Sequence, residues 1–211
     1  MATPQAARLI SLAFDPTIQS PEDLASERIL DAALALAAAS GLRHLTIDDV
    51  ARRANVGRMT LYRRFGSRAA LIEALAVREC RRCLARIAGA LDPSAPVEER
   101  LAVLFTTTLS VIREHPLLER LARVEPEALL LELTRDDSAV FRLVREFLVG
   151  LIREGQRAGE LIAGDPELSA ELGVRLGASF VLIPDTALPL EDQAATRLAV
   201  RTLLSPLRAR R

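Results

Sequence analysis

Lysine and tryptophan are absent from this chain of 211 residues, and aromatic residues make up only 3% of it. Hydrophobic residues still account for 50% of the sequence, so a core must be built mainly from Leu, Ala, Val and Ile. Leu and Ala, with the abundant Arg and Glu, favour helices. The sequence carries no β-hairpin signal and no internal repeat, and it therefore predicts an all-α fold.

Other features are scarce as well. Two cysteines are too few for a disulfide scaffold, and no apolar run has the length of a transmembrane helix. The short apolar run after Arg8 lacks the pattern of a secretory signal. A glycine-rich phosphate loop, a nucleophile elbow and a metal-ligand cluster are all missing. We therefore expect a cytoplasmic protein that is not an enzyme, uses no cofactor or metal, and has no membrane partner.

Charge is unevenly distributed along the chain, although the formal net charge is zero. Residues 43–86 contain eleven arginines and four acids, a surplus of seven positive charges that the remainder must balance. A basic module on an acidic body suits a partner with phosphates on one side, such as DNA. Arginine makes bidentate contacts to phosphate and guanine, but GC-rich coding is the simpler reason for the missing lysine.

Apolar periodicity and end signals divide the chain into helices. Pro21 begins the first, and Thr46 and Ser67 are predicted N-caps. The linker near Pro93 and the step at His115-Pro116 are predicted breaks. The predicted helices span 21–39, 47–54, 58–65, 68–89, 97–114, 116–122, a short one from 126, 139–157, 166–183 and 191–204.

The segment from Thr46 to Arg68 has the pattern of a helix-turn-helix. A short helix ends at Asn55, which tolerates the left-handed backbone of a tight turn, and a second short helix follows Gly57. In such a motif the second helix presents its outward side chains to the DNA major groove. Helix N-termini and arginines suit phosphate contacts, and we assign that role to Thr46, Gly57, Tyr62, Arg64 and Arg68. The predicted base-reading set is Arg58, Met59, Thr60 and Arg63.

Residues 26–77 resemble the N-terminal domain of the tetracycline-repressor (TetR) family, whose T-L-Y-x-x-F core is intact from Thr60 to Phe65. The resemblance implies an all-helical homodimer that regulates transcription in response to a ligand, most often as a repressor. The chain departs from the family pattern at Asn55, Gly57, Arg64 and Arg68. These changes keep or raise the positive charge and leave the operator sequence open.

The resemblance also implies an organisation in domains. We expect an N-terminal arm at 1–19, a three-helix DNA-binding domain at 20–67, and a helical effector-binding and dimerisation domain at 68–211. The predicted partners are a palindromic operator in double-stranded DNA, a second copy of the chain, and a hydrophobic small-molecule effector.

The last two helices are predicted to pair with those of the second copy, with Leu172, Leu176, Phe180 and Leu198 in the interface. The alternative is that these helices only close the monomer core. The middle helices would enclose the effector, although for any single apolar residue ordinary core packing is the better explanation. The predicted pocket residues are Phe105, Thr108, Leu109, Ile112, Leu130, Phe141, Val144 and Phe147.

Cys80 and Cys83 lie among arginines, which can lower the pKa of a thiol and permit redox sensing. Two cysteines three apart in an intact helix cannot be bridged without backbone distortion, so we expect two ordinary helical residues. Two other functions remain open. The chain could be a helix-turn-helix DNA-binding protein without a sensor, or a helical protein-interaction module.

Overall fold

The computed structural model describes residues 21–134, 138–183 and 192–204, and within these ranges the fold is all-α, as predicted. The predicted arm at 1–19 and the predicted start of the last helix at Glu191 lie outside the described residues. None of the described helices is both long and apolar enough to cross a membrane.

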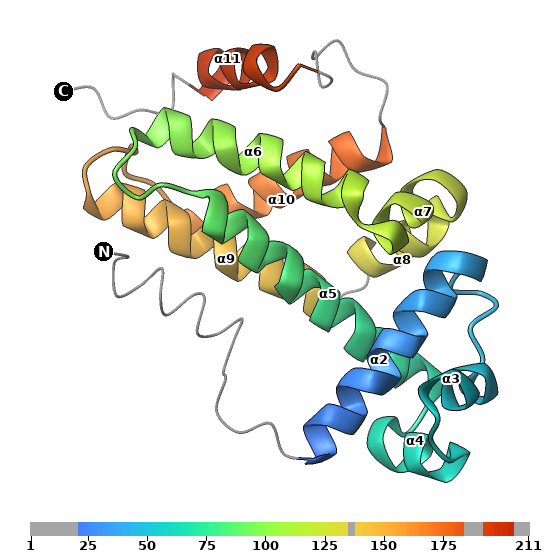
Figure 1. Ribbon diagram of the computed structural model, residues 1–211. Helices are drawn as coiled ribbons and strands as arrows, with labels where there is room; N and C mark the ends of the chain where they lie inside the picture. Colours follow the sequence, from blue (N-terminus) through green and yellow to red (C-terminus); the bar gives the residue numbers. More distant parts are fainter. Residues whose placement is uncertain (1–20, 135–137, 184–191, 205–211) are drawn as a thin grey trace.

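Four helices form the end of the molecule that carries the helix-turn-helix (Figure 1). The turn between the two short helices follows the sequence prediction. Asn55 adopts a left-handed conformation with φ of 54°, and its N–H returns to the carbonyls of Ala51 and Arg52. These elements are α2 (Pro21–Ser40), α3 (Ile47–Ala54), α4 (Arg58–Phe65) and the first turns of α5 (Arg68–Ala90).

The remaining helices form a larger body along which α5 extends (Figure 1). Helix α6 ends where His115 precedes Pro116, because a residue before proline avoids the helical region. The body consists of α6 (Val97–Glu114), α7 (Pro116–Val124), α8 (Pro126–Thr134), α9 (Ala139–Arg157), α10 (Pro166–Leu182) and α11 (Gln193–Leu204).

The larger buried cluster belongs to the helix-turn-helix end. It contains the inward faces of α2, α3 and α4, with Ile29, Val50 and Leu61 fully buried. It continues into α5 through Leu71 and into α7 through Leu117. The expected division between residues 67 and 68 therefore passes through continuous apolar packing, since α5 belongs to both parts.

Candidate DNA interface and ligand cavity

The two short helices of the helix-turn-helix differ in how their N-termini are capped. Thr46 caps α3: its Oγ1 accepts the N–H of Asp49 at 3.1 Å and donates to the Asp49 carboxylate at 2.6 Å. Its hydroxyl is thus occupied within the protein. Gly57 precedes α4 without a side-chain cap, which leaves the N–H groups at that helix start open to an anion.

Among the predicted base-reading residues, Met59 is 77% exposed and Arg63 is exposed. No partner is recorded for the Arg63 guanidinium among the described residues. Arg58 forms an ion pair with Asp48 at 3.2 Å, and its guanidinium carbon lies 5.5 Å from the centroid of the Tyr62 ring. These contacts hold Arg58 beside Tyr62 on the outer side of α4, which favours a preset side-chain position over a mobile one.

Two arginines predicted to contact phosphate also form hydrogen bonds within the protein. Arg64 donates to the Ser26 hydroxyl of α2 at 3.0 Å. Arg68 donates to the carbonyls of Leu45 at 2.6 Å and of Leu42 at 2.5 Å. Both arginines hold the elements around α3 and α4 together, a role that their charge alone does not reveal.

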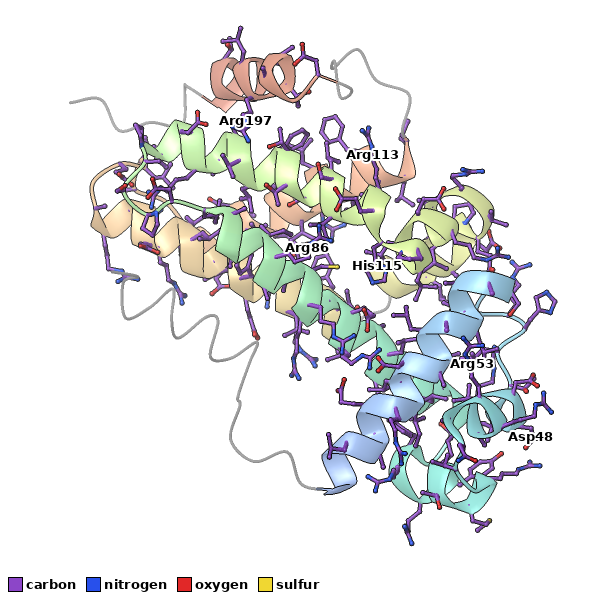
Figure 2. The ribbon with its side chains drawn as sticks, in the orientation of Figure 1. Asp48, Arg53, Arg86, Arg113, His115 and Arg197 are labelled. Carbon is purple, nitrogen blue, oxygen red and sulfur yellow. The ribbon has the colours of Figure 1, made fainter. Side chains whose placement is uncertain are left out.

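Arg53 is an exposed cation that the sequence interpretation left out. It lies in the last turn of α3, where Figure 2 labels it near the helix-turn-helix. Its neighbour Arg52 is paired with Asp49, whereas no partner is recorded for Arg53 within the described part of the chain. Asp49 lies within one turn of both arginines, so the sequence alone could not tell which of the two would be paired.

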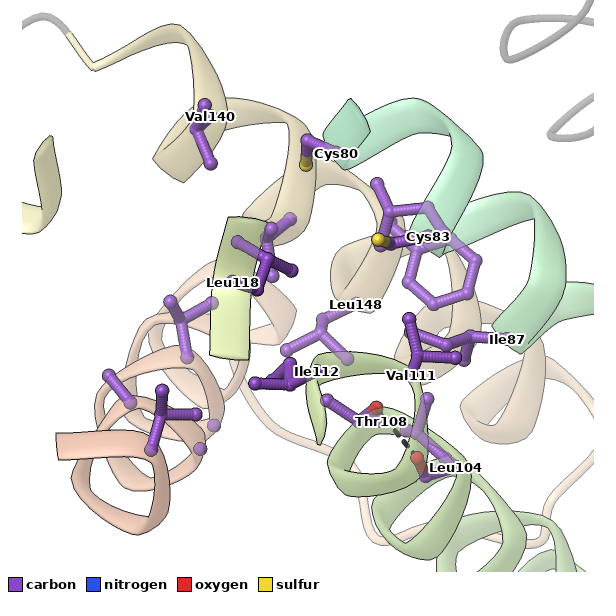
Figure 3. A pocket seen from close by; sticks show the side chains of 18 of the residues that line it. Cys80, Cys83, Ile87, Leu104, Thr108, Val111, Ile112, Leu118, Val140 and Leu148 are labelled. Atoms are coloured by element: carbon purple, nitrogen blue, oxygen red, sulfur yellow. Dashed lines mark hydrogen bonds between the residues drawn. The ribbon is translucent and has the colours of Figure 1, made fainter. Parts of the chain in front are cut away.

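The body encloses a cavity of about 960 Å³ between α5, α6, α9 and α10. Figure 3 shows its inner part, where Leu104, Ile112 and Leu148 face the space and the Thr108 hydroxyl is bonded to the Leu104 carbonyl at 2.7 Å. Polar side chains are few here. The cavity therefore offers an apolar environment that suits an apolar molecule.

Six of the eight predicted pocket residues line this cavity: Phe105, Thr108, Leu109, Ile112, Val144 and Phe147. The other two predictions do not match the lining. Leu130 is 45% exposed on α8, and Phe141 lies under the Arg175 guanidinium, 6.0 Å from the ring centroid. The apolar period could not separate these residues from the lining, because a helix turns its apolar residues toward whichever neighbour packs there.

The residues predicted for the dimer interface differ in where their side chains lie. Leu172, Leu176 and Leu198 are 57–67% exposed. Phe180 lines the cavity and packs edge-to-face on Phe105, with the ring centroids 5.1 Å apart. Leu176 is exposed but also borders the cavity, so α10 turns Phe180 inward, Leu168 and Leu172 outward, and Leu176 to the rim between them.

A buried charged cluster joins the helix-turn-helix end to the cavity wall. Arg78 of α5 donates to Glu27 of α2 at 3.1 Å, to Asp31 at 2.8 Å and to Glu79 at 2.7 Å. Glu79 also contacts His115 Nε2 at 3.0 Å. Burial raises the pKa of Glu79, but the His115 hydrogen bond and the Arg78 charge lower it, and the net direction is down. Since Glu79 lines the cavity, this cluster links the cavity to α2.

A second connection between the helix-turn-helix end and the body lies at the end of α2. Gly41 has φ of +91°, and a Cβ there would lie 1.8 Å from Oε1 of Glu125. Arg43 pairs with Glu127 of α8. Only glycine meets both the backbone and the packing demand at this position.

Cys80 and Cys83 are free thiols whose side chains face the cavity (Figure 3). Burial raises the pKa of Cys80 to about 12 and that of Cys83 to about 11. Such thiols stay protonated at neutral pH, which argues against the redox role because the thiolate is the reactive form.

These features define a helical protein that combines a helix-turn-helix with a hollow body. Residues 29–75 match the family of bacterial regulatory proteins known as the tetR family. The helix-turn-helix end is therefore a DNA-binding domain of the TetR type, as the sequence resemblance predicted.

The chain is 40% identical over 100 residues to MT1294, an HTH-type transcriptional regulator of Mycobacterium tuberculosis. That match covers 46% of this chain and 48% of the relative, so it spans about half the length of each. Two solved structures share the fold over 89% of this chain. They are the TetR family repressor AlkX from Dietzia sp. strain DQ12-45-1b (TM-score 0.63, 24% identity, 95% of that chain) and the fatty acid degradation regulator FadR from Bacillus halodurans (TM-score 0.62, 21% identity, 96% of that chain).

Proposed function

We propose that this protein is a dimeric DNA-binding transcriptional regulator that represses a palindromic operator and releases it when an apolar molecule enters the cavity. The observation that carries the proposal is the path of α5. Only two residues separate this helix from α4, and further along it forms a wall of the cavity. A ligand that displaces α5 therefore also displaces the DNA-reading helix.

Such a displacement matters only if two readers are held at a fixed distance. Paired helix-turn-helix units read half-sites about 34–36 Å apart along the DNA. A ligand that binds better to a form with another spacing weakens DNA binding by its differential affinity. The buried Arg78–Glu79 cluster and the Gly41–Glu125 contact are the two joints through which the body would set the spacing.

The outward stripe on α10 supports the dimer. Leu168, Leu172 and Leu176 follow one another at intervals of one helical turn and are 57–60% exposed. Leu198 of α11 is 67% exposed. Large apolar side chains in a row on one helix face, such as the three leucines of α10, suit burial against a second protein surface, and a two-fold pair of such helices brings identical stripes together.

The similar structures agree with an apolar effector. The AlkX protein is implicated in the biodegradation of n-alkanes, and FadR regulates fatty acid degradation. Both connect this fold with aliphatic chains. The apolar wall of the cavity suits such a chain, because burying it against leucine and phenylalanine gains about 25 cal/mol per Å² of apolar surface.

Operator selection followed by footprinting tests DNA binding. We expect protection of a discrete palindrome, and we expect Arg63→Ala and Tyr62→Ala to weaken binding. The free energy of unfolding should stay within about 0.5 kcal/mol for Arg63→Ala, which is at an exposed position, whereas Tyr62→Ala also removes a ring packed on the core. Arg142→Ala, an exposed arginine on α9, is the matched control. Protection without sequence preference would indicate a DNA-binding protein of another kind, and full binding by both variants would contradict the proposed reading face.

Titration of 1-decanol against the complex tests ligand release, because this probe is neutral and apolar. We expect the affinity for the operator to fall as the alcohol is added. A complex that retains its affinity while decanol is bound would contradict regulation from this cavity.

Analytical ultracentrifugation tests the dimer. Leu172→Arg with Leu176→Arg is expected to give a monomer and to lose operator binding, whereas Val124→Arg, on α7 and also exposed, leaves the dimer intact. A wild-type protein that sediments as a monomer at micromolar concentration would count against the proposal.

A further inference from the structure

The arginines that line the cavity are already engaged within the protein. Arg43 pairs with Glu127, and Arg100 pairs with Glu160. Arg68 donates to the carbonyls at the end of the α2–α3 loop, at 2.6 Å and 2.5 Å. A ligand anion would compete with these contacts at each guanidinium group, although the Nε of Arg100 is a buried donor without a hydrogen-bond partner.

The carboxylates of the lining differ from one another: Glu79 is bonded to Arg78 and His115, whereas two others have no such partner. Glu73 of α5 and Glu154 of α9 line the cavity, and no partner is recorded for either side chain within the described part of the chain. Glu125 is 5% exposed and also lines the cavity, and its Oε2 is buried without a hydrogen-bond partner. A buried acceptor without a donor is unfavourable, so this wall gains from a donor or a positive charge supplied by a ligand.

The helix register directs the two partly exposed carboxylates toward the cavity. Glu73 is seven residues before Cys80, and Glu154 is seven residues after Phe147. Seven residues are two helical turns, so each carboxylate lies on the same face as a residue that borders the cavity. Glu73 is in the part of α5 nearest α4, whereas Glu154 is near the far end of α9 (Figure 1).

The side chains that Figure 3 labels on the inner wall carry no charge, and the neighbouring carboxylate of Glu79 is already bonded to Arg78 and His115. Figure 3 shows leucine, isoleucine and valine side chains with the two thiols, which remain protonated because burial raises their pKa values. Transfer of an isolated anion from water into such surroundings is strongly unfavourable. An apolar chain fits there, and any polar end must meet the carboxylates.

We propose that the cavity selects its ligand by charge, accepting an apolar molecule with a neutral or cationic polar end and excluding apolar carboxylates and other anions. This inference rests on the proposed function only in taking the cavity as the effector site. Glu73 and Glu154 are the groups that receive a cationic end, and the engaged arginines are the reason that an anionic end is refused.

Three probes with the same ten-carbon chain test the selection: 1-decanol, decyltrimethylammonium and decanoate. Isothermal titration calorimetry with the purified full chain, below the concentration at which micelles form, gives each affinity. We expect decyltrimethylammonium to bind at least as tightly as decanol, and decanoate to bind at least about tenfold more weakly than both, as for a charge buried without a partner.

Substitution of the carboxylates assigns the recognition to residues. The double variant Glu73→Gln with Glu154→Gln is expected to weaken decyltrimethylammonium by about fivefold or more, with decanol binding unchanged. Glu146→Gln, an exposed acid on the same helix α9, is the matched control and leaves all affinities unchanged. A double variant that binds the cation as the wild type does would overturn the assignment.

Arg100 is the residue through which an anionic ligand could bind and so contradict the charge selection. Its Nε is buried without a hydrogen-bond partner, so it is the donor that a carboxylate would use after rearrangement. Decanoate that binds as tightly as the other probes, and that loses affinity in Arg100→Gln, would overturn the proposal, as would the absence of binding by all three probes.

The ranking of the probes is separable from the proposed function. Equal binding of all three probes, each releasing DNA, would leave the regulator intact and remove the charge selection. Binding in the expected order without release of DNA would uphold the selection and contradict regulation from the cavity.

Discussion

The inward side chains of α3 and α4 are closely packed against other helices, whereas those of α5 and α9 line the cavity. Val50 and Leu61 are fully buried within a cluster that joins five helices. In the body, the buried cluster is smaller. It consists of Cys83, Ile87, Val111 and Phe147, and all four line the cavity of about 960 Å³. One region holds its shape through dense packing, and the other leaves packing incomplete.

The difference bears directly on function. A helix that reads DNA must present its outward side chains in a fixed geometry, and a close-packed core supplies that rigidity. A cavity wall lacks contacts on one side, so its helices can move at a smaller loss of packing. The buried charges of Arg78 and Glu79 lie where the two regions meet, which suits a junction that must couple them.

The largest expected loss of stability comes from truncating a side chain in the closely packed cluster around α3 and α4. Leu61→Ala removes a fully buried side chain and should lower the free energy of unfolding by about 2–5 kcal/mol, enough to unfold much of the helix-turn-helix end. Urea denaturation followed by circular dichroism measures the loss. Ile112→Ala at the cavity is the comparison, and it should lose less because that side chain is only half-buried; equal losses would mean that the two regions are packed alike.

Overpacking gives the next largest contrast. Ala33→Leu adds volume where the side chain is fully buried, and we expect a loss of about 1–3 kcal/mol. Ile112→Phe adds volume toward the cavity and should be neutral or stabilising. It should also weaken decanol binding. Thermal unfolding of both variants would contradict the contrast if Ile112→Phe proved the more damaging.

The cap of α3 should give a smaller effect. Thr46→Ala removes the hydrogen bond to the Asp49 N–H and should lower the free energy of unfolding by about 1 kcal/mol. Thr46→Ser, which keeps the hydroxyl, should retain most of the stability. A DNA affinity that falls much further than the stability would show that Thr46 also contacts phosphate.

The pH dependence of the junction should be the smallest effect. The pKa of Glu79 is held below its ordinary value of 4.5, so its ionisation stabilises the fold above that pH, and the stabilisation is lost as pH falls through the lowered value. The stability difference between the wild type and Glu79→Gln should therefore shrink in acid below about pH 4.5. Glu119→Gln, at an ion pair on α7 that lies away from this cluster, serves as the control, and a difference that grows in acid would contradict the assignment.

Much of the fold follows from local signals in the chain. Thr46, Asn55 and Ser67 mark helix ends through caps and a left-handed turn, and their signals depend on neighbours within a few residues. The residues of the cavity were only partly predictable. Cys80 and Cys83 were recognised as a pair but not as part of the lining, because a helical period gives a face and not the neighbour that covers it.

The sequence by itself determined the helices, the tight turn at Asn55, the excess of arginine around it and the outward placement of Met59 and Arg63 on α4. Tertiary structure alone decided which arginines are occupied. Arg64 and Arg68 look like phosphate ligands in the chain, yet Ser26 and the carbonyls of Leu42 and Leu45 hold them. The physical reason is distance along the chain: charge is a property of one residue, whereas its partner comes from another element that only folding brings within hydrogen-bond reach.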